Sequence, residues 1–325
     1  YPIVEFLSWK TVFQLPFQPT LAVGEAYANG TMMIHNGTLY DALRAMMEVR
    51  ENKQTTMLSK LTTLYESAFL FRKDGRRRAQ SAHNIHSHYD LGNAFYELFL
   101  DPDMQYSCGY FPDPETDLTT AQAAKKAHIA KKLLLTKNAS VLDIGCGWGG
   151  LGLTLARDYG ASVAGITLSK EQLITAQAKA AQDPKLAVDF TYRDYRDVTE
   201  LYDHIVSVGM FEHVGKKQFP IYFRTIDRLL KEDGVAVIHT IGSSLTSSGS
   251  DPFISKYIFP GGYIPKLSEI MASIEQTSLR VTDIEVWHDH YAKTLRHWRQ
   301  RFMAKREEAL AMFDDRFCRI WEFYL

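Results

Sequence analysis

The sequence has 325 residues, enough for a full enzyme core with a smaller appended domain, because single domains usually run to ~100–200 residues. Its 37 basic and 38 acidic residues give a formal net charge of -1, which argues against nucleic acid as a partner because phosphate binding needs concentrated positive charge. Three scattered cysteines, Cys108, Cys146 and Cys318, are too few for a disulfide framework or a metal cluster and favour a reducing cytoplasm.

Hydrophobic residues are not concentrated in any run of the ~18 apolar residues that a spanning helix needs. We therefore predict a cytoplasmic protein that is soluble or peripherally associated with the inner face of the membrane. Because the sequence opens on Tyr1 without an initiator methionine and stops at Leu325 inside a helical pattern, we expect further residues at both ends.

Composition predicts two domains separated by a basic hinge. Residues 1–72 mix short apolar runs with Pro and Gly and contain a helix-like stretch at 40–49, which indicates a small, incomplete N-terminal domain. The hinge is predicted at 73–80, where three arginines follow one another. Residues 81–325 are predicted to form the catalytic domain.

From residue 140 onward, strand, glycine turn and helix signals alternate, which predicts an α/β fold with a doubly wound, mostly parallel sheet covered by helices. One helix is predicted to begin after Ser169 as N-cap, with Gln172 three residues on. A seven-strand sheet of this kind would need a last strand that the residues after Trp298 do not provide, so we expect it beyond Leu325. The predicted strands are 141–144, 163–168, 205–208, 235–240 and 283–287, and the predicted helices are 151–156, 170–181, 219–230 and 294–325.

A glycine-rich turn follows the first strand of this domain. Asp143 precedes Gly145, Gly147 and Gly149, so the backbone can turn sharply and approach a nucleotide closely. The spacing G-x-G-x-G-G with an acid in front differs from a pyrophosphate cradle and suits a ligand that carries an amine or hydroxyls. A tight turn without a ligand remains the alternative reading of this motif.

The arrangement resembles the class I S-adenosylmethionine-dependent methyltransferases, whose first motif is this strand, acid and glycine turn. Most of that class carry an acid at the end of the second strand, whereas this sequence reads G-I-T-L-S-K-E-Q over residues 165–172. That version is typical of the cyclopropane synthase family, which the sequence also resembles at three further segments: 88–96, 106–111 and 207–215. The segments 239–242 and 256–262 extend the resemblance from about residue 80 to the last residue, and the N-terminal part matches more loosely, through 24–30.

The resemblance implies two sets of site residues. The cofactor-binding set for S-adenosylmethionine consists of Tyr106, Ser107, Asp143, Gly145, Gly147, Gly149, Thr167, Gln172, Tyr195 and Arg196. The catalytic set, which in this family holds a bicarbonate ion, consists of Cys108, Glu212, His239, the backbone of Ile241, and Tyr291. A further cysteine of the family is expected after Leu325, and no metal is expected.

The resemblance also implies the reaction, in which a methylene group passes from S-adenosylmethionine to the cis double bond of an unsaturated phospholipid acyl chain. A carbocation forms and loses a proton to bicarbonate as the cyclopropane ring closes, so the pocket must be dry. Insertions at 243–267 and 288–325 are expected to form a lipid channel, the N-terminal domain to have a lipid or membrane role, and the protein to dimerise.

Two other functions stay open. A lipid methyltransferase would leave a branched or methylene-bearing chain without closing a ring, and the sequence barely separates the two reactions. An inactive lipid-binding subunit with the same fold is the second alternative, although it would have no need of a base site.

Several residues have a simpler interpretation beside the functional one. His83 and His86 have the spacing of metal ligands but lack further ligands nearby. Cys146 is interpreted as a small buried filler, and His204 and His213 as structural histidines. Four lysines at 125, 126, 131 and 132, together with the arginines of the hinge, form either a solvated face or a contact with an anionic bilayer.

Overall fold

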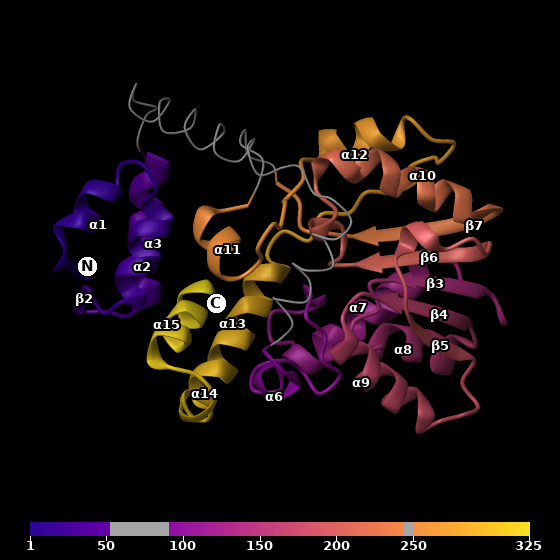
Figure 1. Cartoon of the computed structure of the whole chain (residues 1–325), viewed down its shortest axis with the longest axis horizontal. Helices are drawn as coiled ribbons and strands as arrows, with labels where there is room; N and C mark the ends of the chain where they lie inside the picture. The colour runs from indigo at the N-terminus through magenta and orange to yellow at the C-terminus, as the bar shows by residue number, and fades with distance from the viewer. Residues whose placement is uncertain (53–90, 244–249) are drawn as a thin grey trace. The chain divides into compact units, whose positions relative to one another are not determined.

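The computed structural model describes residues 1–52, 91–243 and 250–325 (Figure 1). The chain divides into two compact units. The first consists of Tyr1–Gly75, Gly249–Gly261 and Lys305–Leu325, and the second of Arg76–Ser248 and Gly262–Ala304. Each unit is described by itself, through its described residues.

A parallel sheet forms the centre of the second unit. Its strand order is β5-β4-β3-β6-β7, and every neighbouring pair is parallel, with Val141 opposite Val163 on one side and His204 on the other. The strands are β3 (Ser140–Ile144), β4 (Ser162–Thr167), β5 (Val188–Tyr192), β6 (Tyr202–Val208) and β7 (Leu230–His239).

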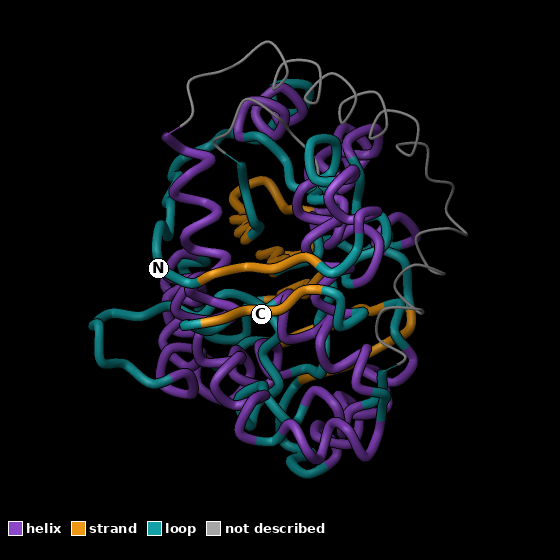
Figure 2. The backbone as a smooth tube through the Cα atoms, turned by 90° about the vertical axis from the view of Figure 1, so that its left-hand side faces the viewer, coloured by secondary structure: helices purple, strands orange, loops and turns teal. Residues whose placement is uncertain are grey.

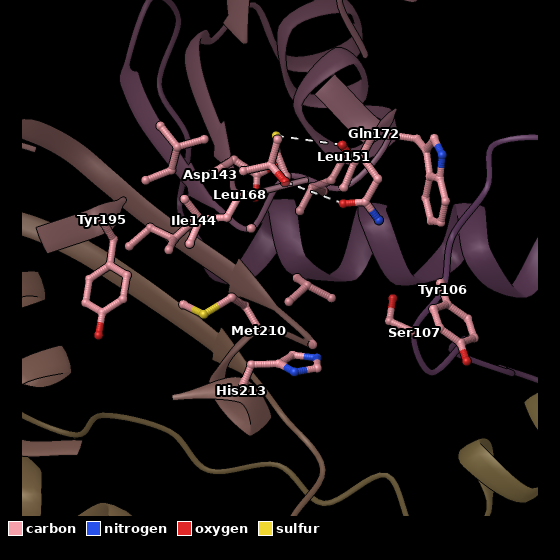
Figure 3. A pocket seen from close by; sticks show the side chains of 18 of the residues that line it. Tyr106, Ser107, Asp143, Ile144, Leu151, Leu168, Gln172, Tyr195, Met210 and His213 are labelled. Carbon is pink, nitrogen blue, oxygen red and sulfur yellow. Dashed lines mark hydrogen bonds between the residues drawn. The ribbon is translucent and has the colours of Figure 1, made fainter. Parts of the chain in front are cut away.

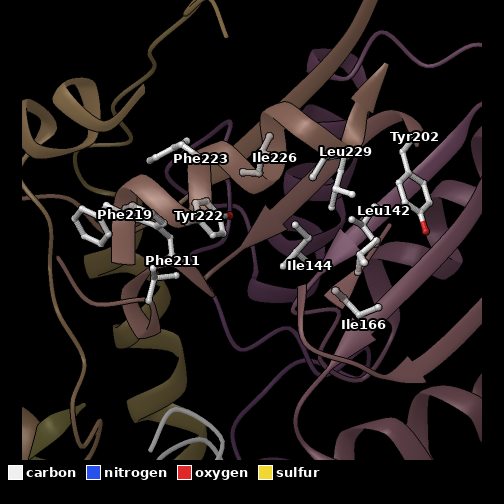
Figure 4. Packing of buried hydrophobic residues seen from close by; sticks show 13 residues of the cluster. Leu142, Ile144, Ile166, Tyr202, Phe211, Phe219, Tyr222, Phe223, Ile226 and Leu229 are labelled. Carbon is white, nitrogen blue, oxygen red and sulfur yellow. The ribbon is translucent and has the colours of Figure 1, made fainter. Parts of the chain in front are cut away.

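Alternating residues of these strands face opposite sides of the sheet, and both sides are apolar. Leu142 and Ile144 join the core cluster under α10 (Phe219–Leu229), drawn in Figure 4. Val141 joins a second cluster with Leu133 and Leu155, which lie on the opposite face. A sheet buried on both faces requires helices on both, which is the doubly wound arrangement that the sequence predicts.

The helices of the second unit follow the strands in the expected alternation. Asp117 caps α7 by accepting hydrogen bonds from the amides of Thr119 and Thr120, and Ser169 caps α9 by accepting one from Gln172, as the sequence predicts. The helices are α6 (Asn93–Tyr96), α7 (Leu118–Lys132), α8 (Gly150–Tyr159), α9 (Lys170–Ala181), α10, α12 (Leu267–Ile274) and α13 (His290–Ala304), with 3₁₀ turns η1 (Tyr195–Asp197), η2 (Phe211–His213) and η3 (Lys216–Gln218).

The sheet differs from the prediction in two strands. β5 was not predicted, and the predicted strand at 283–287 is not formed, so the parallel sheet of the described residues has five strands; the strand expected beyond Leu325 stays a prediction. At 283–287 the alternation is real, but its polar side faces the protein: Glu285 accepts from His128 at 2.7 Å and pairs with Lys132 at 2.8 Å, while Ile284 and Val286 are 51% and 78% exposed. Side-chain ion pairs hold this segment instead of ladder hydrogen bonds.

The first unit combines the N-terminal elements with segments far along the chain. Strands β1 (Ile3–Phe6) and β2 (Met32–His35) pair antiparallel and lie side by side next to the N label of Figure 2. The helices of this unit are α1 (Trp9–Gln14), α2 (Pro19–Ala28), α3 (Leu39–Asn52), α11 (Pro252–Tyr257), α14 (Arg306–Met312) and α15 (Asp315–Tyr324).

Helix α2 carries the segment 24–30 that the sequence matches only loosely, and it packs against α11 and α15. A Cβ at Gly24 would lie 2.3 Å from the ring of Phe253, so only glycine permits this approach. Glu25 accepts from Lys256 at 2.5 Å and from the hydroxyl of Tyr257 at 2.8 Å, and nearby Tyr27 donates to Glu322 at 2.8 Å.

These contacts place parts of the two predicted lipid-channel insertions in the same compact unit as the N-terminal domain, which composition alone did not indicate. The predicted hinge at 73–80 lies outside the described residues, so the boundary there stays a prediction. Within the described parts of the chain, every helix is too short or too polar to span a bilayer.

Candidate functional site

The turn between β3 and α8 brings three glycines to the carboxyl end of the sheet. Gly145 has φ +82° and a Cβ there would lie 2.8 Å from Met210, while Gly147 has φ +55° and a Cβ there would meet nothing within 4 Å. Both glycines line a pocket. Gly149 differs, because its Cβ would meet Phe190 at 2.8 Å and Gly149 is not part of the lining. The requirement for glycine at this position comes from packing against Phe190, and the predicted contact of Gly149 with the cofactor stays a prediction.

The pocket lies where the turn, the end of β4 and the loop before α7 meet, and it holds about 1150 Å³ of empty space including open solvent. Figure 3 shows Tyr106 and Ser107 on one side and Tyr195 on the opposite side, with Met210 and His213 between them. The predicted cofactor residues in the lining are Tyr106, Ser107, Asp143, Gly145, Gly147, Thr167, Gln172, Tyr195 and Arg196.

Polar side chains at the end of β4 are ordered by hydrogen bonds within the protein. Thr167 accepts from the amide of Ser169 at 3.1 Å and donates to the side-chain oxygen of Gln172 at 3.4 Å. Because the Gln172 oxygen accepts from Thr167, its amide NH₂ is left to donate to a ligand. This arrangement supplies polar contacts where most of the class carry an acid.

Asp143 is a buried acid at the end of β3. Burial raises the pKa of its carboxyl to about 7, an effect that the positive charge of Lys125 partly offsets. Its Oδ2 atom is buried and has no hydrogen-bonding partner among the described residues. An unpartnered buried oxygen in a pocket wall is costly unless a ligand donates to it.

At the far side of the pocket, Arg196 is held by Asp194. The guanidinium donates to both carboxylate oxygens, at 2.8 and 2.5 Å, which fixes the 3₁₀ turn η1. Burial raises the pKa of the neighbouring Tyr195 to about 12, so its phenol stays protonated. Tyr195 and Arg196 can therefore offer an aromatic ring and a fixed, planar guanidinium group to the nucleobase of a ligand.

The structure brings Glu212 and Ile241 of the predicted catalytic set into direct contact. Glu212 Oε1 accepts from the backbone amide of Ile241 at 2.8 Å, whereas Oε2 is buried without a partner in the described part of the chain. Burial raises the pKa of this carboxyl. The amide that was expected to bind the ion thus binds Glu212 instead.

His239 ends β7, two residues before Ile241. Burial lowers the pKa of its imidazole to about 3, and Lys125 adds to the effect, so the ring is neutral at pH 7. Its Nδ1 atom is buried and has no partner within the described residues. Trp287, which the sequence did not single out, packs on this ring with a centroid distance of 4.8 Å and on Tyr110 at 5.0 Å.

Cys108 lies in the loop before α7 and Tyr291 lies on α13, and neither residue belongs to the lining of the pocket at the glycine turn. Burial raises the pKa of the Cys108 thiol to about 11, so it is a neutral thiol rather than a nucleophile. The next residue, Gly109, donates to the Thr294 hydroxyl at 2.9 Å, which joins this loop to α13. Tyr291 lies on the same helix, one residue past His290, whose ring centroid is 5.7 Å from that of Trp287.

Several residues of the lining were missed or interpreted differently from the sequence. Met210 and His213 flank the predicted catalytic Glu212 and line the cofactor pocket, although His213 was interpreted as structural. The motif 207–215 could have indicated this, because a turn that places the side chain of Glu212 at a site also places the adjacent residues near that site. Cys146, interpreted as a filler, packs with Leu153 and Phe190 and also belongs to the pocket lining, and burial raises the pKa of its thiol well above the usual value.

The hypothesis that the α7 lysines contact a bilayer is wrong for two of the four, because Lys125 and Lys126 are buried. Lys132 is partly exposed and pairs with Asp283 and Glu285, so for Lys131 and Lys132 the hypothesis stays a prediction. The arginines of the hinge and the histidines at 83 and 86 lie outside the described residues, and the described ones contain no group of three His, Cys, Asp or Glu that could hold a metal.

Comparison with known proteins gives consistent results. Residues 76–325 match the family model of mycolic acid cyclopropane synthetase. The chain is 40% identical over 322 residues to the cyclopropane-fatty-acyl-phospholipid synthase of Escherichia coli K12, covering 98% of this chain and 80% of that protein. It is 43% identical over 252 residues to a probable fatty acid methyltransferase of Pseudomonas putida, covering 75% of this chain and 64% of that protein.

Among solved structures, the crystal structure of a mycolic acid cyclopropane synthase complexed with SAH and CTAB is similar at a TM-score of 0.71 and 32% identity. The match covers 75% of this chain and 90% of that one. The pocket at the glycine turn, the parallel sheet and these matches agree, and the chain belongs to the mycolic acid cyclopropane synthetase family as an S-adenosylmethionine-dependent methyltransferase.

Proposed function

We propose that this enzyme transfers a methylene group from S-adenosylmethionine to the cis double bond of unsaturated phospholipid acyl chains and forms a cyclopropane ring. The observation that carries the proposal is the pairing of two features in one unit. A pocket is built around the glycine turn, and Met210 and His213, close to Glu212 in the sequence, line it. Glu212 and His239 each keep a buried polar atom that has no partner among the residues the structure describes, as a site for a small polar reactant requires.

The chemistry makes clear demands on these residues. The alkene carbon forms a bond to the methyl group as the bond from sulfur to that methyl breaks, leaving S-adenosylhomocysteine and a carbocation on the acyl chain. The cation must be kept from water, and aromatic faces can stabilise it. Tyr110 and Trp287, packed beside His239, are aromatic residues suited to this role. Ring closure then requires removal of a proton from the transferred methyl group.

Bicarbonate is the base that we propose for this proton. The donor set fits a small oxyanion in part: the neutral imidazole of His239 can donate or accept, and the raised pKa of Glu212 reduces its repulsion of an anion. The amide of Ile241 fits less well, because Glu212 already accepts its hydrogen. Glu212 would therefore hold the ion chiefly through Oε2, with Cys108 and Tyr291 completing the set.

A methyl-branching reaction is the second candidate, because the relative from Pseudomonas putida is named a probable fatty acid methyltransferase. That reaction would share the first step and differ only in the proton that is lost. An inactive lipid-binding subunit is disfavoured by the buried polar atoms of Glu212 and His239 that have no partner in the described part of the chain, because a binding module has no reason to retain them.

We also propose that the protein is cytoplasmic and contacts the inner face of the membrane peripherally, and that it works as a homodimer. An acyl substrate held in a bilayer requires such an approach. In the first unit, Trp9 and Phe13 on α1 are 77% and 71% exposed, with ring centroids 6.5 Å apart, beside exposed Lys10. Aromatic side chains favour the lipid headgroup region, and a lysine favours anionic lipid.

The membrane proposal is tested with the double variant Trp9→Ser, Phe13→Ser in sedimentation with anionic phospholipid vesicles. Reduced vesicle binding at unchanged S-adenosylhomocysteine affinity is expected, since α1 belongs to the first unit and the cofactor pocket to the second. Vesicle binding equal to that of the parent protein would remove this surface from the proposal.

The main experiment uses the full chain, S-adenosylmethionine with a labelled methyl group and vesicles of cis-unsaturated phospholipid, with and without added bicarbonate. Proton NMR of the acyl chains should show labelled, upfield ring protons whose yield rises with bicarbonate. A labelled branched alkene would favour the second candidate, and cofactor binding without any label would favour the inactive subunit. Ring formation that is indifferent to strict removal of bicarbonate would overturn only the proposed base.

A further inference from the structure

Helix α7 buries a lysine directly behind the cofactor pocket. The Lys125 side chain is fully buried, which is rare for lysine unless the charge is paired. Among the described residues it forms no salt bridge; its ammonium donates instead to the Ser107 hydroxyl at 2.7 Å and to the side-chain oxygen of Gln105 at 2.9 Å. Burial lowers the pKa of Lys125 to about 8, while Asp101 nearby opposes the shift.

A second residue on the same face of α7 holds the backbone of the same loop. Gln122, three residues before Lys125, donates to the carbonyl oxygens of Ser107 at 2.9 Å and Gln105 at 3.3 Å. Asp101 accepts from the amide of Gln105 at 2.9 Å. The backbone of this loop is therefore fixed without Lys125, whose ammonium donates to two side chains, those of Ser107 and Gln105, among the residues that the structure describes.

The bonds of Lys125 set the polarity of the pocket wall. An ammonium group can only donate, so the Ser107 oxygen must accept from it, and the hydroxyl hydrogen is left to donate elsewhere. Ser107 lines the cofactor pocket, and Figure 3 shows it beside Tyr106 at the pocket wall. A donor backed by a positive charge favours a negatively charged acceptor and disfavours an ammonium group.

We propose that Lys125 is a positioning residue that presents the Ser107 hydroxyl as a hydrogen-bond donor to the carboxylate of the cofactor's amino-acid part. The inference rests on the proposed use of S-adenosylmethionine, which carries a carboxylate and an ammonium on the same carbon. Lys125 thereby selects the orientation in which the carboxylate faces Ser107. It acts through Ser107 and belongs to neither predicted set of site residues.

The test compares two ligands that differ only in this carboxylate: S-adenosylhomocysteine and its decarboxylated form, S-adenosyl-3-thiopropylamine. Isothermal titration should show the parent protein binding the first at least about tenfold more tightly, since each tenfold corresponds to ~1.4 kcal/mol. Lys125→Met, which is similar in length and uncharged, should reduce this ratio at least about fivefold, because charge-assisted hydrogen bonds are the stronger ones.

Ser107→Ala should reduce the ratio to a similar extent, and the double variant should show no further loss because both changes remove one interaction. Lys126→Met is the matched control. It removes a neighbouring buried lysine that pairs with Asp103 in the same loop but does not touch Ser107. Its ratio should stay at the parent value.

Three outcomes would overturn the inference while leaving the proposed function intact. The first is equal binding of both ligands by the parent protein. The second is an unchanged affinity ratio in Lys125→Met and Ser107→Ala. The third is a loss of that ratio in Lys126→Met as large as in Lys125→Met. Failure of the parent protein to bind S-adenosylhomocysteine at all would instead count against the proposed function. A purely structural role for Lys125 would weaken both ligands equally and leave the ratio unchanged.

Discussion

Alanine substitutions at Gly147 and at Gly145 should distinguish a glycine that leaves space for the cofactor from a glycine that is required by packing within the protein. Both positions have positive φ, where alanine costs ~1–2 kcal/mol. At Gly147 the new Cβ meets no protein atom within 4 Å, so this strain is the whole folding cost. At Gly145 the Cβ would lie 2.8 Å from Met210, and relieving such an overlap costs a further ~1–3 kcal/mol.

Thermal unfolding and titration with S-adenosylhomocysteine measure the two effects. With a midpoint shift of ~2–4 °C per kcal/mol, Gly145→Ala should melt clearly below Gly147→Ala. Both should lose affinity, but Gly147→Ala should lose at least about tenfold while staying folded, because its Cβ enters space that the ligand needs. Parent-like affinity in Gly147→Ala would mean that the cofactor does not approach this turn, and equal melting of the two variants would refute the packing argument.

Three further predictions concern Glu212, His239 and Ser169. Glu212→Gln should keep S-adenosylhomocysteine affinity and lower kcat about 100-fold or more, and parent-like turnover with labelled cofactor would exclude it from the base site. Burial lowers the pKa of His239 from 6.5 to about 3, so below pH 6.5 the unfolded chain binds a proton that the folded one does not. The contribution of the neutral His239 ring to the free energy of unfolding is therefore fully present above pH 6.5 and is lost as the pH falls towards 3. His239→Gln should make the urea midpoint decrease less steeply over this pH range. A pH dependence equal to that of the parent protein would contradict a buried neutral ring. Ser169→Ala should lower the free energy of unfolding in urea by about 1 kcal/mol through loss of the α9 N-cap. An unchanged free energy of unfolding would show that the cap does not stabilise the protein.

The cofactor half of the site was largely predictable from the sequence. A glycine turn after a buried strand must lie at the carboxyl end of a parallel sheet, so the local pattern was enough to predict that Gly145 and Gly147 line a pocket there, and the family resemblance added Thr167. The packing of Gly149 against Phe190 could not be predicted in the same way, because Phe190 is distant in sequence. The same limit applies to Lys125, since an exposed and a buried lysine look alike in a helical pattern.

The catalytic half depended more on the tertiary structure. Glu212 and His239 were known only through resemblance, and nothing local indicated that the Glu212 carboxylate would occupy the Ile241 amide. Trp287 lay in a segment predicted as a strand, and its contact with His239 follows from ion pairs between that segment and α7.

The sequence by itself determined the alternating α/β order, the glycine turn and the family, because each depends on residues close together along the chain. Only the tertiary structure decided which charges are buried, that 250–261 and 305–325 join the N-terminal helices in one compact unit, and that 283–287 turns its polar side inward. These features depend on contacts between residues far apart in sequence. Burial and pairing with such distant partners set the charge and the direction of each side chain, and no local pattern records them.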